Sequence, residues 1–300
     1  MSFLISELDI LNCFQHLVEA PFDDAQLVVG SGDDAAVIKS NIKDLVHSLD
    51  VSTVSKHFPK NSDPKDIAYR SISTALSDLA AMGAYPSFIS IGLTADSKDI
   101  QWYKNFTNGT EQILKDFNLK LVGGDITYGE LNICVNVFGY PYKKPLTRSN
   151  AQVGDDIYIT GKLGLARQGL KDFKLKKKSE FINYYFKPEP EFKKSELISP
   201  FASSCIDISD GLLKDLKTIC SQSNVGATID YEKIPIHNDM HDLTYGDDYV
   251  LCFTTSKKNS DNFQEPDFYK IGQISNKKDV VIKKNNKKLE FDKNGWDSFE

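Results

Sequence analysis

The chain has 300 residues, of which 40% are hydrophobic, and this length leaves room for two domains because a single hydrophobic core stops growing at roughly 250 to 300 residues. Its formal net charge of −6 argues against a nucleic-acid partner, since proteins that bind nucleic acids gather Lys and Arg against the phosphates. No run approaches the ~18 apolar residues of a membrane-spanning helix, and Glu7 and Asp9 lie where a secretory signal would be basic or apolar. We therefore expect a cytoplasmic protein without a membrane partner.

Short apolar runs alternate with helical patterns through the first half of the chain. The patterns predict strands at 27–30, 45–49 and 87–95, helices at 66–82 and 100–117, and two further strands in LKLVGG and LNICVNVFGY. The segment PYKKPLTRSN then interrupts the alternation with two prolines and several charges. Such a segment is typical of a linker, so we place a domain boundary near 146–150.

The second half opens with a predicted strand in DDIYITG and a helix start in GLARQGL. A helix is predicted to begin near Asp210, with Ser209 as its N-cap, because the apolar stripe of DGLLKDLKTIC has helical spacing. Strands follow near ATIDY, YVLCFTT, FYKIGQI and VVIKK. Mixed strands and helices in both halves predict two α/β or α+β domains.

Aspartates follow apolar, strand-like runs at four places. The runs end in small residues, and the aspartates that come next are Asp33 and Asp34 in LVVGSGDDAAV, Asp50 in LVHSLD, Asp125 in LKLVGGD, and Asp207 and Asp210 in SSCIDISDGL. A single Asp beside Gly is often only a turn whose carboxylate bonds its own backbone. Several carboxylates brought together, however, repel one another and cannot all stay ionised without a cation. The recurrence therefore predicts a cation site at strand ends, where ligand-binding loops collect.

Asp78 lies inside a predicted helix rather than in a turn. The apolar stripe of this helix passes through Ile72, Leu76 and Leu79, and Asp78 sits on its flank instead of on the opposite, solvated face. Two interpretations stay open: Asp78 is a further member of the acidic site, or it is a partly exposed helical carboxylate that pairs with Arg70.

The acidic candidates offer hard oxygen ligands, which favours Mg²⁺ over zinc. The five histidines are dispersed, and the five cysteines lie among apolar neighbours without C-x-x-C spacing, so we interpret the cysteines as core residues. Because Mg²⁺ usually bridges substrate phosphates, a nucleotide is the predicted partner. The sequence has no G-x-x-x-x-G-K-[ST] loop and no H-R-D or D-F-G motif. GSGDDA matches a dinucleotide fingerprint only superficially, since its carboxylates would repel a pyrophosphate.

Taken in order, the motifs resemble those of the thiamine monophosphate kinases, a family in the superfamily that includes aminoimidazole ribonucleotide synthetase, selenophosphate synthetase and a hydrogenase maturation factor. The matching strings span nearly the whole chain: GSGDDAAVI, HSLDVSTVSKHF, ALSDLAAMGAYP, LVGGDITYG, PLTRS, DDIYITGKLGLARQGL, IDISDGLLKDL, GDDYVLCFT and GWDSF. Their combination is far more specific than any one of them.

The resemblance implies an α/β (α+β) fold with two domains of the aminoimidazole ribonucleotide synthetase type. Residues 1–147 would form an N-terminal domain that binds ATP and Mg²⁺ and pairs its sheet with that of a second subunit in a homodimer. Residues 148–300 would form the C-terminal domain. The implied reaction is the direct in-line transfer of the γ-phosphoryl group of ATP to thiamine monophosphate, which gives thiamine diphosphate and ADP.

Carried over position by position, the resemblance assigns three groups of site residues and no general base. Those expected at several Mg²⁺ ions are Asp34, Ser48, Leu49, Asp50, Asp78, Asp125, Asp207 and Asp210. Those expected to contact ATP are Gly124, Asp125, Arg148 and Ser209. Those expected to contact thiamine monophosphate are His57, Asp247 and Trp296. From the residues alone, Arg148 could instead form a surface ion pair, and His57 and Trp296 could be packing residues.

Three departures from the family pattern concern the substrate side. Asp247 stands where the family usually has Glu, Ile126 stands where it has Thr, and Ser55 and Lys56 stand where a glycine often precedes the His-Phe pair. Two rival functions stay open: another ATP-dependent synthetase of the same superfamily, and a non-catalytic sensor of nucleotides or thiamine phosphates.

Overall fold

The computed structural model describes residues 7–18, 27–29, 37–38, 44–264 and 266–298. The chain divides into two compact units. The N-terminal unit is made of Met1–Leu79 and Tyr85–Tyr140, and the C-terminal unit of Ala80–Ala84 and Pro141–Glu300. In the described part of the chain, none of the helices combines the length and the apolar character that crossing a membrane requires.

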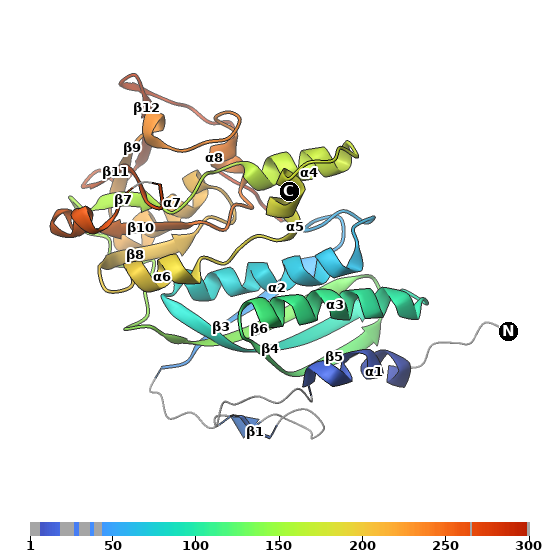
Figure 1. Cartoon of the computed structure of the whole chain (residues 1–300). Helices are drawn as coiled ribbons and strands as arrows, with labels where there is room; N and C mark the ends of the chain where they lie inside the picture. Colours follow the sequence, from blue (N-terminus) through green and yellow to red (C-terminus); the bar gives the residue numbers. More distant parts are fainter. Residues whose placement is uncertain (1–6, 19–26, 30–36, 39–43, 265, 299–300) are drawn as a thin grey trace. The chain divides into compact units, whose positions relative to one another are not determined.

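The N-terminal unit is built on a four-stranded sheet with the strand order β3-β6-β4-β5 (Figure 1). Its strands are β3 (Val46–Thr53), β6 (Asn132–Pro141), β4 (Ala84–Ala95) and β5 (Lys120–Tyr128). β3 runs antiparallel to β6, and β4 runs parallel to β5. A parallel pair needs a crossover connection, which α3 (Ile100–Asp116) supplies. A separate antiparallel pair joins β1 (Leu27–Val29) and β2 (Val37–Ile38).

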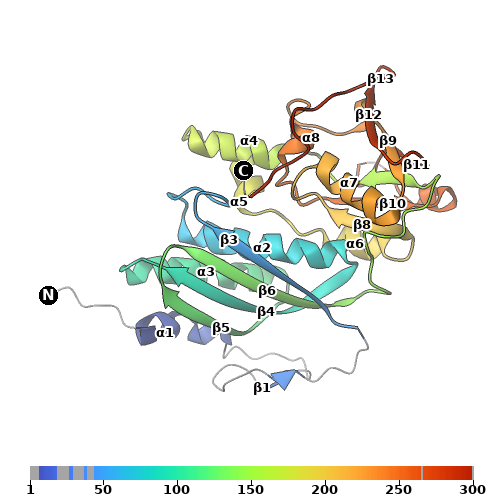
Figure 2. The same ribbon diagram turned by 180° about the vertical axis from the view of Figure 1, so that it is seen from behind.

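Helices cover this sheet. α2 (Pro64–Ala81) and α3 lie side by side over one face, whether seen from the front or from behind (Figures 1 and 2), and α1 (Glu7–Val18) lies against β5 and α3. Gly109 lets α3 approach α2 closely, because a Cβ there would lie 2.1 Å from the carbonyl oxygen of Lys65. Ile72, Leu76 and Leu79 are fully buried on α2, which confirms the predicted apolar stripe.

The C-terminal unit contains a seven-stranded sheet with the order β13-β12-β9-β11-β7-β10-β8. Its strands are β7 (Asp156–Ile159), β8 (Ala202–Asp207), β9 (Gly226–Asp230), β10 (Leu251–Thr255), β11 (Tyr269–Ser275), β12 (Val280–Lys284) and β13 (Lys287–Lys288). β12 is parallel to β9, while the pairs β12–β13, β9–β11, β11–β7, β7–β10 and β10–β8 are antiparallel.

α7 (Leu212–Ser223) packs against β8, β9 and β12 of this sheet. Leu212, Leu216 and Ile219 of α7 are fully buried in the core of the unit, as their spacing predicts. The remaining helices are α4 (Leu165–Lys174), α5 (Phe181–Phe186), α6 (Phe192–Ile198), α8 (Asp242–Tyr245) and the 3₁₀ turns η1 (Tyr231–Lys233) and η2 (Lys257–Asn262). The mixed α/β fold is therefore confirmed.

The five cysteines are unbridged thiols. Cys205, Cys220 and Cys252 are buried, which confirms their prediction as core residues, whereas Cys13 and Cys134 are only partly buried.

A short segment at the end of α2 belongs to the C-terminal unit rather than to the N-terminal one. The carbonyl oxygens of Met82 and Gly83 accept from the backbone N–H groups of Leu146 and Tyr142, both at 2.9 Å. The carbonyl oxygen of Ala80 accepts from the hydroxyl of Ser195 at 2.6 Å. The chain therefore passes from one unit to the other at three places, not at one.

Two local predictions about the aspartates were wrong. Asp50 and Asp125 were predicted to follow strands, but they lie inside β3 and β5, where they pair with Val135 and Gly92. Pairing with the neighbouring strands continues past the small residues. Asp207 does end its strand, as predicted. The N-cap of α7 is Gly211, with φ 116°, and not Ser209. The side chain of Asp215 accepts the N–H groups of Asp210 and Gly211, so no serine cap is needed there.

Candidate functional site

Ser48, Asp50 and Asp78 form one acidic group in the N-terminal unit. Ser48 and Asp50 alternate with outward residues on β3, so their side chains share the face that meets α2. The Ser48 hydroxyl donates to Asp78 Oδ2 at 2.5 Å. Burial and, next, the charge of Asp78 raise the pKa of Asp50 to about 6, although a hydrogen bond from Thr74 opposes the shift. The group thus holds two carboxylates whose mutual repulsion a cation would relieve.

The pKa of Asp50 predicts how stability depends on pH when no metal is present. Because the folded pKa lies above the unfolded value, the stability contributed by Asp50 falls as the pH rises from about 4 to about 6, by about 2–3 kcal/mol in all. Asp50→Asn should therefore unfold at a higher urea concentration than the wild type at about pH 8 in EDTA, and with little difference at about pH 4.5. An equal gain in stability at both pH values would show that the raised pKa of Asp50 is not its cause.

Leu49 lies on the other face of β3 from Ser48 and Asp50, and its side chain is 49% exposed. Its side chain therefore points away from the acidic group, and only its backbone could reach a metal held there.

Gly124 and Asp125 follow one another in β5. A Cβ on Gly124 would lie 2.4 Å from the carbonyl oxygen of Ile91, so the close pairing of β4 and β5 requires glycine. Asp125 is exposed, and one of its carboxylate oxygens accepts from the N–H of Ile126 at 3.0 Å. β5 therefore presents the Asp125 carboxylate to solvent at the edge of the sheet.

His57 lies in the turn that follows β3. Its Nδ1 accepts from the backbone N–H of Thr53 at 3.0 Å, so a neutral ring carries its proton on Nε2. Ser55 in the same turn has φ 70°, a left-handed conformation that favours glycine. The family's usual glycine near this position thus has a backbone reason, and this chain tolerates the strain.

The C-terminal unit brings three distant segments together around residues 209–211, called the 209–211 loop. The N–H of Asp247 donates to the Ser209 carbonyl at 2.8 Å, and the N–H of Trp296 donates to the Asp210 carbonyl at 2.9 Å. Asp207, which is 3% exposed, ends β8 just before this loop. Ser209, Asp210, Asp247 and Trp296, singled out in the sequence, are therefore neighbours in space.

The segment 246–249 that carries Asp247 has a strained backbone. Gly246, Asp247 and Tyr249 have φ values of 79°, 69° and 54°, and residues other than glycine rarely adopt such values. The Asp248 side chain accepts from the Gly164 N–H at 2.7 Å, while its second oxygen is buried without a hydrogen-bond partner in the described part of the chain. Burial raises the pKa of Asp248 well above its usual range.

Two residues of α7 belong to this site although the sequence reasoning missed them. Asp215 accepts the N–H groups of Asp210 and Gly211, both at 3.1 Å. Burial, and then the charges of Asp207 and Asp210, raise its pKa to about 8. Lys214 pairs with Asp210 at 2.8 Å. The sequence held a signal for Asp215, because a carboxylate there interrupts the apolar stripe between Leu212 and Leu216.

Arg148 and Asp34 are two further residues that the sequence predicts for the site. Arg148 is exposed, and its carbonyl oxygen accepts from the Ser223 hydroxyl at 3.0 Å, which ties its loop to the end of α7. Asp34 lies outside the described residues. Within the described ranges, no cluster of three or more His, Cys, Asp or Glu side chains is close enough to hold a metal ion.

Residues 32–140, which include the four-stranded sheet, match the family described as AIR synthase related protein, N-terminal domain. The chain therefore contains an N-terminal domain of this class, which is followed by a second unit of mixed strands and helices. It is 38% identical over 303 residues to a thiamine-monophosphate kinase of Buchnera aphidicola subsp. Schizaphis graminum, covering 92% of this chain and 94% of that protein. It is 34% identical over 251 residues to the Escherichia coli thiamine-monophosphate kinase, covering 77% of each.

A crystal structure of thiamine-monophosphate kinase from Stenotrophomonas maltophilia is similar to most of the chain. The TM-score is 0.82 at 28% sequence identity, and the match covers 93% of this chain and 96% of that one. The chain therefore belongs to the thiamine-monophosphate kinase family, which confirms the resemblance found in its motifs.

Proposed function

We propose that this protein transfers the γ-phosphoryl group of ATP to the phosphate of thiamine monophosphate, giving thiamine diphosphate and ADP. Its relatives named thiamine-monophosphate kinase match over most of the chain. The observation that carries the proposal in the structure is the meeting of Asp207, Asp210, Asp247 and Trp296 around one loop. The carboxylates could hold a phosphate through a metal ion, and the exposed indole could stack on a cationic aromatic ring. Together they suit a ligand that carries both groups.

We propose Mg²⁺ as the metal. The donors present are carboxylate and hydroxyl oxygens, which are the ligands that Mg²⁺ prefers, and the crowding of Asp50 and Asp78 is the kind of repulsion that a bound cation offsets. Bound Mg²⁺ would supply neutralisation of phosphate charge. The proposed ligands are Asp34, Ser48, Asp50, Asp78, Asp125, Asp207 and Asp210, with the Leu49 position contributing through its backbone.

The remaining roles concern positioning. We assign ATP contacts to Gly124, Asp125, Arg148 and Ser209, because a guanidinium and backbone groups suit phosphate oxygens. His57, Asp247 and Trp296 would orient thiamine monophosphate. The attacking phosphate oxygen is already ionised near neutral pH, so the chain need not supply a general base. Alignment of the two substrates and neutralisation of their charge would account for most of the catalysis. We propose that residues 1–147 carry dimerisation and most of these ATP and Mg²⁺ contacts. Residues 148–300 would form the second domain and carry the rest, at Arg148, Asp207, Ser209 and Asp210.

A coupled assay of ADP release tests the function. The purified protein should release ADP when ATP and thiamine monophosphate are both present, and EDTA should stop the release. Tight binding of both ligands without turnover would favour a sensor. Absence of both binding and turnover with thiamine monophosphate would favour a synthetase that acts on another acceptor.

We further propose that the protein is a homodimer that pairs through β3. β3 lies at the edge of the four-stranded sheet, and an unpaired edge strand is a template for pairing with another chain. Leu49 and Val51 on the outer face of β3 are 49% and 45% exposed. Pairing two such edges would extend both sheets and bring these side chains beside their counterparts on the partner strand.

Val51→Lys should convert the dimer to a monomer, because it would place a charge at the centre of the proposed interface. Size-exclusion chromatography with light scattering would show the mass fall to that of one chain. The matched control is Leu197→Lys, which changes a 59% exposed leucine of α6 and should leave the mass unchanged. A wild-type protein that is monomeric at micromolar concentration would refute the dimer.

A further inference from the structure

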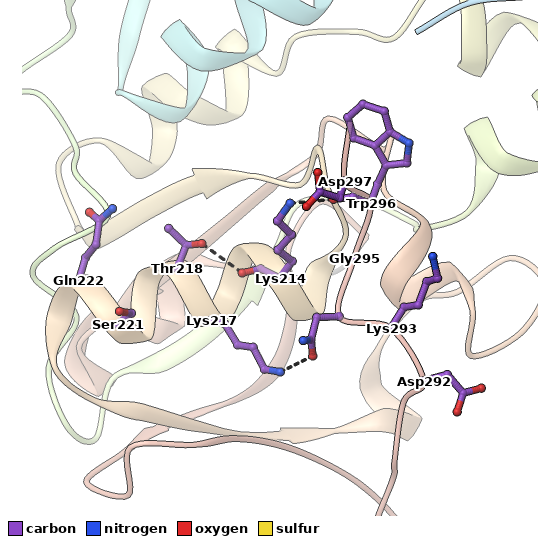
Figure 3. Close-up of a pocket in the computed structure, with 11 residues that line it drawn as sticks. Lys214, Lys217, Thr218, Ser221, Gln222, Asp292, Lys293, Gly295, Trp296 and Asp297 are labelled. Carbon is purple, nitrogen blue, oxygen red and sulfur yellow. Dashed lines mark hydrogen bonds between the residues drawn. The ribbon is translucent and has the colours of Figure 1, made fainter. Parts of the chain in front are cut away.

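The segment Asn294–Trp296 lies along α7 without helix or strand structure of its own (Figure 3). Its contacts with α7 come from two lysines. Lys217 Nζ donates to Asn294 Oδ1 at 2.5 Å, and Lys214 Nζ donates to the carbonyl oxygen of Trp296 at 2.7 Å. Lys214 and Lys217 are three residues apart, so they share one face of the helix. We call this pair the lysine clasp.

The backbone of the segment fits closely against the start of α7. A Cβ on Gly295 would lie 2.7 Å from the carbonyl oxygen of Asp210 and 2.7 Å from Cβ of Lys214, so glycine is needed for this approach. Beside this contact, α7 and residues 292–297 line an open pocket of about 680 Å³ (Figure 3). The segment is therefore seated on the helix and not merely near it.

Lys214 joins two features of the candidate site through one ammonium group. It pairs with the Asp210 carboxylate at 2.8 Å and donates to the Trp296 carbonyl at 2.7 Å, while the Trp296 N–H donates to the Asp210 carbonyl at 2.9 Å. Both backbone polar groups of Trp296 are thus fixed to Asp210 and its partner. This fixation sets where the 37% exposed indole stands relative to the 209–211 loop.

We propose that Lys214 and Lys217 are positioning residues that hold the Trp296 indole in place for thiamine monophosphate. The substrate part of this inference rests on the proposed function, in which the indole contacts the thiamine ring. The clasp itself does not, since it is a property of the protein without ligand. Lys217 gives the cleaner test, because it donates to Asn294, which is not a proposed metal ligand.

Fluorescence tests the clasp without any substrate. The chain has two tryptophans, and Trp102→Phe leaves Trp296 as the sole reporter while keeping an aromatic ring that can stack on Phe106, as Trp102 does. In this background, Lys217→Met and Lys214→Met should each raise the acrylamide quenching constant of Trp296, roughly twofold, because the segment opens more often. Lys257→Met, an exposed lysine of η2, is the matched control and should change nothing.

Kinetics test the role in substrate binding. Lys217→Met should raise KM for thiamine monophosphate by about two- to fivefold and Lys214→Met by roughly three- to tenfold, the size expected for one or two partly exposed hydrogen bonds. KM for ATP and kcat should change little in Lys217→Met, which touches no proposed metal ligand. Lys214→Arg should recover most of the loss, because it keeps the charge and the donors. The pair Lys217→Met and Asn294→Ala should not be additive, since either change removes the same hydrogen bond.

Unchanged quenching in both methionine variants would overturn the clasp. Increased quenching with an unchanged KM for thiamine monophosphate would overturn the role of the lysine clasp in substrate binding. The clasp would then be a structural contact only. A wild-type protein that turns over no thiamine monophosphate would instead refute the proposed function, and the quenching result would still decide whether the clasp exists.

Discussion

Asp78→Asn is expected to lower kcat/KM by a factor of about 10³ or more, since it removes a charge that would hold the proposed Mg²⁺ at the reacting phosphates. The fold should persist. Asparagine keeps an oxygen that can accept from the Ser48 hydroxyl, which now donates to Asp78 at 2.5 Å. Loss of the Asp78 charge also removes one cause of the raised pKa of Asp50, so the metal-free variant should be at least as stable as the wild type.

ADP release and urea unfolding in EDTA measure the two sides of this prediction. Asp66→Asn serves as the matched control, because Asp66 lies in the first turn of the same helix, whereas Asp78 lies in its last turn. The control should keep full activity. An Asp78→Asn protein that retained a tenth or more of wild-type turnover would mean that the Ser48, Asp50 and Asp78 group is not part of the catalytic site.

Gly246→Ala is expected to destabilise the protein by about 3 kcal/mol or more and to raise KM for thiamine monophosphate at least about tenfold. Gly246 has φ 79° and ψ −160°, a region that is essentially restricted to glycine. A Cβ there would also lie 2.3 Å from the carbonyl oxygen of Ser209. Relief of this clash must displace the 209–211 loop or Asp247, and both belong to the candidate site.

Gly154→Ala separates the clash from the backbone strain. Gly154 has φ 93°, but a Cβ added there would meet no heavy atom within 4 Å. Its substitution should cost only about 1 kcal/mol and leave the KM for thiamine monophosphate unchanged. If the two alanine variants lost equal stability and both kept normal kinetics, the close contact between Gly246 and the 209–211 loop would not affect substrate binding.

The sequence predicts helices and buried faces well, and strand limits around glycine poorly. The stripe of Ile72, Leu76 and Leu79 determines α2, because helical periodicity depends only on nearby residues. The extension of β5 through Gly124 and Asp125 depends on pairing with β4, which no local pattern reveals. Small residues that look like strand ends in the sequence therefore lie where strands approach closely.

The site shows the same division between local and distant information. Candidate aspartates can be recognised in the sequence because they recur beside apolar runs. The roles of Asp215 and Lys214 cannot be recognised there, since both depend on where Gly211 and Trp296 lie in space. The sequence marks Asp215 only as a carboxylate within an apolar stripe. Hydrogen bonds to backbone carbonyls and N–H groups leave no signature in residue types, so what Asp215 and Lys214 hold becomes visible only in three dimensions.

The segment Ala80–Ala84, held by Ser195, Tyr142 and Leu146, has a consequence for dissecting the protein. A truncation after Tyr140 would strip this segment of its bonding partners and leave the end of α2 frayed, a few residues from Asp78. The complementary fragment would lack the piece of chain that fills its own surface there. A single cut therefore cannot separate the two units, and the fragments 1–140 and 141–300 should need each other for residues 80–84 to regain these hydrogen bonds.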